Sequence, residues 1–85
     1  MDKQKILEEL LGLLEKNGVM IRNEPMGGCG GGLCTINGEK SFFVDTEAQS
    51  GEIASVCAKI VPEVIDFDNV YMKPQIRQFI QSHSN

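Results

Sequence analysis

The sequence contains no run of basic residues. Eight lysines and arginines stand against twelve aspartates and glutamates, so the formal net charge is -4 at pH 7. A protein with this balance repels phosphate backbones, and no local cluster of cationic side chains reverses the repulsion. We therefore expect no nucleic-acid partner.

Long apolar runs are also absent. No stretch reaches the roughly 18 consecutive apolar residues that a membrane-spanning helix needs, and the chain carries no lipidation motif. The N-terminal segment lacks the unbroken apolar core of a signal peptide, because Glu8, Glu9 and Glu15 interrupt it. Three cysteines, an odd number, are typical of reduced thiols in a chain without an export signal. We expect a cytoplasmic protein with no membrane partner.

Histidine is scarce as well, since His83 is the single one. A nucleophilic cysteine such as Cys29 needs a neighbouring base or cation, and the sequence places none near it. The acid pair Asp45 and Glu47 is explained by helix electrostatics, because carboxylates favour the positive end of a helix that begins there. The sequence therefore predicts no catalytic residues, and we do not expect an enzyme.

Metal-ligating residues are present but badly spaced. Cys29 and Cys34 form one wide pair, while Cys57 and His83 are single and distant in sequence. Structural zinc sites usually combine two tight pairs. Cys34 and Cys57 instead fit the apolar positions of a strand and a helix, where a buried thiol acts as a small hydrophobe. We predict no metal and no cofactor.

The composition, with 41% hydrophobic and 24% charged residues over 85 positions, is typical of a single globular domain covering residues 1–85. Apolar periodicity, an Asp2 N-cap, an Asn37-Gly38 turn and the helix-breaking Pro62 set the expected boundaries. Residues 63–73 are too mixed to assign. We expect helices over 2–16, 47–61 and 74–82, and strands over 19–24, 33–37 and 40–45.

This order of elements predicts an α+β, two-layer fold. We expect a three-stranded antiparallel meander, with the two longer helices and the short C-terminal helix packed on one face. Alternation places Met20 and Phe43 on the opposite face of the sheet. An uncovered sheet face or an unpaired edge strand is a surface on which a second copy or another protein could dock.

The most unusual segment is PMGGCGGGLC, residues 25–34. Its glycines depart from the two common phosphate-binding motifs, because the spacing is wrong and a strand rather than a helix follows. Three hypotheses remain: a hairpin connection, a nest of backbone amides that binds an anion, and a loop that exposes a redox-sensitive Cys29. The candidate ligand-binding residues are Gly28, Cys29, Gly30, Gly31 and Gly32.

Two segments carry a resemblance to a known family. GGCGGGLCTINGEKSFFVDT, residues 27–46, and VYMKPQIRQFI, residues 70–80, resemble a family of small bacterial proteins of unassigned function. The resemblance implies a bacterial cytoplasmic protein and brings no activity or cofactor to particular residues.

We therefore expect a small cytoplasmic protein-interaction module that acts as a homodimer through its sheet and has no catalytic activity. The alternative hypothesis is a small-molecule or anion-binding protein that uses the glycine-rich loop 26–34, with or without redox chemistry at Cys29. The sequence alone identifies neither the partner nor the ligand.

Overall fold

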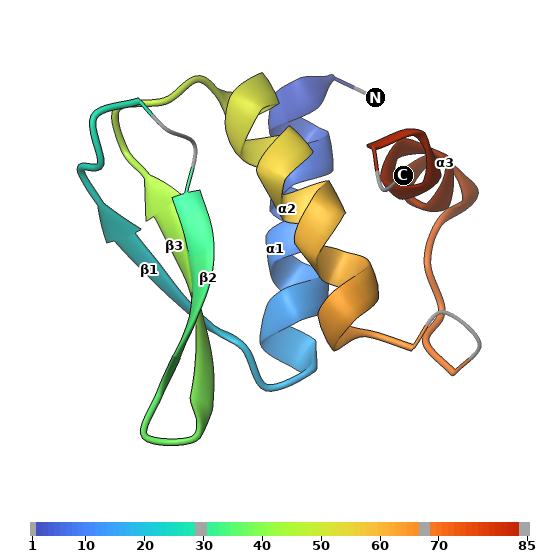
Figure 1. Cartoon of the computed structure of the whole chain (residues 1–85). Coiled ribbons are helices and arrows are strands. Elements are labelled where there is room, and N and C mark those ends of the chain that lie inside the picture. Colours follow the sequence, from blue (N-terminus) through green and yellow to red (C-terminus); the bar gives the residue numbers. More distant parts are fainter. Residues whose placement is uncertain (1, 29–30, 67–68, 84–85) are drawn as a thin grey trace.

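The computed structural model describes residues 2–28, 31–66 and 69–83. The described chain has an α+β composition, as predicted. Its elements are α1 (Lys3–Lys16), β1 (Met20–Glu24), β2 (Gly31–Ile36), β3 (Glu39–Asp45), α2 (Ser50–Val64) and α3 (Pro74–His83). The sheet, the pair α1 and α2, and then α3 form three successive layers (Figure 1).

The first helix begins and ends where local chemistry predicts. The Asp2 side chain accepts a 2.8 Å hydrogen bond from the Lys5 amide and so satisfies one of the unpaired donors of the first turn. At the other end, Gly18 adopts a φ of +86°, which terminates the helix in the left-handed region. The apolar stripe of α1 is buried against the rest of the core through Leu7, Leu10 and Leu14.

The sheet differs from the predicted antiparallel meander. Its strand order is β1-β3-β2, with β1 parallel and β2 antiparallel to β3, so the sheet is mixed. The hairpin between β2 and β3 is confirmed, and Asn37 and Gly38 have the two positive φ values that its turn needs. The prediction failed because it placed β2 in the middle. The uninterrupted apolar run of β3 takes that position instead, where neighbouring strands cover both of its edges.

The second helix starts and ends three residues later than predicted. Its N-cap is Gln49, which makes no side-chain capping hydrogen bond. Pro62 does not end the helix. Its ring lies on the exposed side, while Val61 and Ile65 on either side are buried in the core, so packing offsets the lost backbone hydrogen bond.

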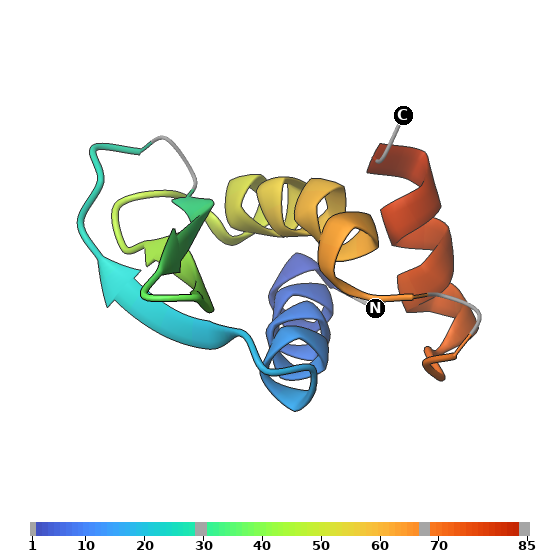
Figure 2. The same cartoon turned by 60° about the horizontal axis from the view of Figure 1, so that its bottom comes forward.

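The third helix does not pack on the sheet, contrary to the prediction. It lies on the far side of α1 and α2, which separate it from the strands (Figure 2). Ile76 and Ile80 bury its apolar stripe against the helix pair. Ile65 and Met72, from the stretch left unassigned, extend the core to this third layer. The remaining element boundaries agree with the predictions within two residues.

Every helix in the described part of the chain is too short or too polar to cross a membrane.

Candidate functional site

The glycine-rich segment connects β1 to β2, and two of its candidate residues, Cys29 and Gly30, lie outside the described residues. Gly31 is fixed by packing: its φ is +127°, and a Cβ at this position would overlap the backbone carbonyl oxygen of Phe43. Gly28 has a φ of +91° in open surroundings. Gly32 has neither constraint, since its φ is not positive and a Cβ would meet nothing within 4 Å. Two of the three described candidates therefore have a backbone reason to be glycine, and Gly32 has none.

Asp45 holds the start of this segment to the end of β3. Its carboxylate is fully buried, and Oδ1 accepts hydrogen bonds of 2.9 Å from the amides of Met26 and Glu47. The amide of Thr46 also donates to the carbonyl of Glu24, which joins the ends of β3 and β1. Asp45 therefore has the role of a buried acceptor for backbone amides.

This arrangement bears on the anion-nest hypothesis. The Met26 amide at the start of the loop already donates its hydrogen bond to the Asp45 carboxylate. The negative charge of this carboxylate repels an anion bound nearby. No described residue between Pro25 and Gly38 carries a charged side chain. The ligand-binding role of Gly28, Cys29, Gly30, Gly31 and Gly32 stays a prediction.

The described cysteines occupy contrasting positions. Cys57 is buried in α2, as predicted, and burial raises the pKa of its thiol to about 12. Cys34 is exposed on β2, contrary to the prediction, because β2 is an edge strand rather than a central one. Within the described residues, no three His, Cys, Asp or Glu side chains lie together as a metal site would require.

His83 lies at the end of α3. Its Nδ1 is 2.9 Å from the carbonyl oxygen of Phe79, and the two rings lie with their centroids 4.3 Å apart. These contacts give His83 a structural role at the end of α3, where its side chain faces the negative end of the helix dipole.

The sheet has one covered and one open face. All three helices lie on the same side of the strands (Figure 2), and Phe42 and Val44 point to that side, where they are buried. We call the opposite side the outer face. The strand register places these residues on it: Met20, Arg22, Gly32, Cys34, Ile36, Glu39, Ser41 and Phe43.

Apolar side chains are exposed on the outer face. Met20 is 47% and Ile36 45% exposed, and Phe43, which lies farther from the hairpin turn than either, is half-buried. Phe43 faces Arg22 on β1 and Gly32 on β2, so its ring has a bare backbone on one side. The predicted placement of Met20 and Phe43 on the face away from the helices is correct. Exposed apolar side chains on an uncovered sheet face favour protein contacts.

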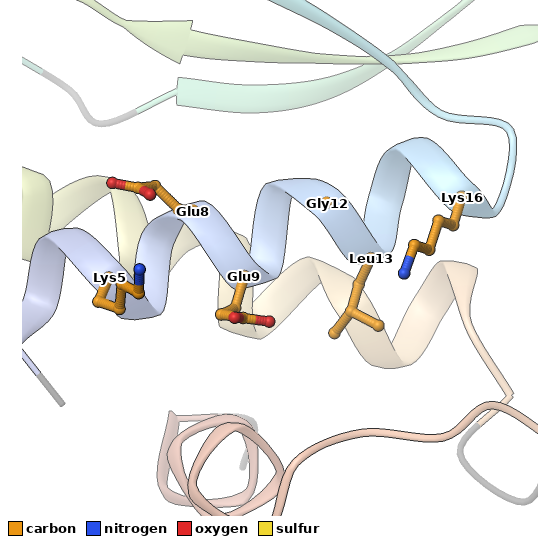
Figure 3. A pocket seen from close by; sticks show the side chains of 6 residues that line it. All are labelled: Lys5, Glu8, Glu9, Gly12, Leu13 and Lys16. Carbon is orange, nitrogen blue, oxygen red and sulfur yellow. The ribbon is translucent and has the colours of Figure 1, made fainter.

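Sequence reasoning missed a hollow on the exposed side of α1. It has a volume of about 300 Å³, and its lining side chains include lysines and glutamates from successive turns (Figure 3). A smaller hollow of about 130 Å³ adjoins it beside α3. The signal in the sequence was Gly12, in the middle of a helix. A Cβ at Gly12 would meet nothing within 4 Å.

The charges along this hollow are partly paired. Lys73 Nζ lies 2.8 Å from Glu9 Oε1. The hydrogen bond lowers the pKa of Glu9 and raises that of Lys73. Both groups are open to solvent, so the pair ties the start of α3 to α1 without forming a buried ionic site.

Comparison with known proteins gives no match: no protein-family model, curated protein or solved structure matches the chain.

Proposed function

We propose that this chain is a small, non-enzymatic protein-interaction module that acts as a homodimer through its sheet. The observation that carries the proposal is the outer face, where Met20, Phe43 and Ile36 place apolar surface next to solvent. The location in the cytoplasm and the relation to small bacterial proteins belong to the same proposal and rest on the sequence.

The size of the chain supports self-association. A domain of 85 residues buries a smaller fraction of its surface than a larger one, so its free energy of unfolding is small. Burial of apolar area against a second copy contributes roughly 25 cal/mol for each Å² removed from water. A second copy that buries apolar area of the sheet would therefore stabilise the fold.

The proposal is tested by placing charge on the outer face. The double variant Met20→Lys/Ile36→Lys changes two exposed positions that do not belong to the core. We expect its dimer dissociation constant to be at least tenfold higher than that of the wild type, because a lysine that enters the interface would be desolvated against apolar surface. The measurement is native mass spectrometry over a concentration series.

Tyr71→Lys is the matched control. Tyr71 is 82% exposed and precedes α3, the helix that lies on the side of the helix pair away from the sheet (Figure 1). This variant should keep the dissociation constant of the wild type. Equal weakening by both variants would contradict an interface on the sheet, and a ligand mass retained on the protein would favour the binding-protein alternative.

A further inference from the structure

The free edge of β2 lacks the features that protect other sheet edges. Edge strands usually carry charged residues, proline or a bulge that prevents another strand from pairing with them. Gly31–Ile36 contains no charged residue and no proline. The opposite edge of the sheet, β1, carries Arg22 and Glu24. The two edges thus differ, and β2 is the one open to a further strand.

Hairpin geometry determines which backbone groups face this edge. The turn at Asn37 and Gly38 closes on the pair Ile36 and Glu39, and such a turn joins its flanking residues by a hydrogen bond. Bonded and non-bonded pairs then alternate along an antiparallel ladder. The amides and carbonyls of Leu33 and Thr35 therefore point away from β3, toward the free edge.

We infer that the second copy adds its own β2 to this edge in antiparallel orientation, with Cys34 opposite Cys34 of the second copy, giving one continuous six-stranded sheet. The inference rests on the proposed homodimer and places its interface at the β2 edge, next to Ile36, so Met20 on the opposite edge lies outside it. Leu33 forms a hydrogen-bonded pair with Thr35 of the second copy. The two-fold axis relates this pair to the equivalent pair of Thr35 with Leu33 of the second copy.

The register follows from where regular backbone begins and ends. Gly31 has a φ of +127° and Asn37 a φ of +52°, so the regular extended backbone lies between them. The residues between them, 32–36, are centred on Cys34. This register pairs every residue of the regular strand on both copies. A shift by one residue would leave part of the strand unpaired, or would bring the outer face of one copy beside the inner face of the other.

The side chains on the outer face complement one another in this register. Ile36 lies opposite Gly32 of the second copy. On the neighbouring strand of that copy, Phe43 of the second copy pairs with this glycine. The exposed Ile36 side chain thereby covers the bare backbone beside a half-buried aromatic ring. This contact accounts for glycine at position 32, which nothing within one copy requires. The strand is uncharged, so the pairing opposes no like charges although each copy is acidic overall.

A cross-linking experiment tests the register directly. A directly opposed, non-hydrogen-bonded pair has its Cα atoms about 4.5 Å apart, which lies within the range of roughly 4.4 to 6.8 Å that a disulfide spans. Diamide would accept two electrons and two protons as the two Cys34 thiols form an Sγ–Sγ bond. We expect a covalent dimer whose digested peptides contain the Cys34–Cys34 link.

Two cysteine variants control this result. Cys29→Ser should leave the yield of covalent dimer unchanged, while Cys34→Ser should abolish it. Cys57 is a poor competitor, because it is buried and its thiol pKa is raised to about 12. A covalent dimer that persists in Cys34→Ser would contradict the register.

A backbone variant tests the same edge without sulfur chemistry. Thr35→Pro removes an amide that points to the free edge, so β3 loses no hydrogen bond and the isolated fold should keep its circular dichroism spectrum. We expect a dimer dissociation constant at least tenfold higher than that of the control Thr35→Val.

The outcomes separate this inference from the proposed function. A wild-type dimer that neither forms the Cys34–Cys34 link nor weakens in Thr35→Pro would overturn the edge pairing and leave the homodimer standing. A wild-type chain that is monomeric at every concentration tested would overturn both.

Discussion

At the scale of single residues, Asp45 is the side chain on which the glycine-rich connection most depends. It is fully buried and accepts the amides of Met26 and Glu47. Asp45→Ala should lower the free energy of unfolding by about 3 kcal/mol, because two part-buried hydrogen bonds from backbone amides lose their acceptor. Denaturant unfolding measures the change. Glu47→Ala, at an exposed position, is the control and should stay within about 0.5 kcal/mol of the wild type.

The cysteines give a second prediction at this scale, which concerns their reactivity. In the folded protein at about pH 8, an alkylating reagent should label Cys34 and leave Cys57 unmodified, because only thiolates react and the Cys57 pKa is about 12. The same raised pKa implies that folding holds the proton on Cys57, so its contribution to stability is lost as the pH rises from 9.0 toward 12. Peptide mass mapping after labelling distinguishes the two sites. Equal labelling of both would contradict the burial of Cys57.

At the scale of elements, the local signals in the sequence were reliable. The Asp2 cap, the Gly18 helix end and the Asn37-Gly38 turn each involve residues within a few positions of one another, so sequence chemistry alone predicts them. The pairing of β1 with β3 joins segments separated by the whole glycine-rich connection. No signal near β1 in the sequence indicates whether this strand pairs with β3 or with β2. The apolar run in β3 was the available signal that β3 is the central strand.

The same contrast between local and distant causes explains why the role of the glycines at residues 30–32 could not be predicted. The sequence shows that residues 30–32 are all glycine but not why, because the neighbour that excludes a Cβ at Gly31 is the carbonyl of Phe43 on another strand. The exposure of Cys34 was missed for the related reason that strand order decides which strand is an edge.

Two substitutions in β2 test this distinction. Gly31→Ala should lower the free energy of unfolding by about 3 kcal/mol, because it combines an unfavourable φ with backbone overlap. In the monomer, Gly32→Ala should raise it by about 0.5 kcal/mol, since the site has room within one copy and alanine restricts the unfolded chain. Thermal or denaturant unfolding compares the variants at one protein concentration below the dimer dissociation constant, because an alanine at position 32 would meet Ile36 of the second copy in the proposed dimer. Equal losses in both variants would contradict the assigned packing of Gly31.

At the scale of the whole molecule, the three-layer arrangement leaves the sheet with helices on only one side (Figure 2). Apolar periodicity predicted the α+β class and the number of elements, because it distinguishes helices from strands. The position of α3 behind the helix pair was not predictable in the same way, since an amphipathic helix fits any apolar surface of suitable size. Likewise, the hollow over α1 depends on which neighbours surround Gly12, and sequence gives only the glycine itself.

The central claim is that two copies associate through the sheet, and the mass of the wild-type chain in solution tests it most directly. Native mass spectrometry under reducing conditions excludes dimers held together only by disulfides. We predict a species with the mass of two 9.4 kDa chains at micromolar concentration, with no added mass. A single 9.4 kDa species throughout the micromolar range would contradict the claim.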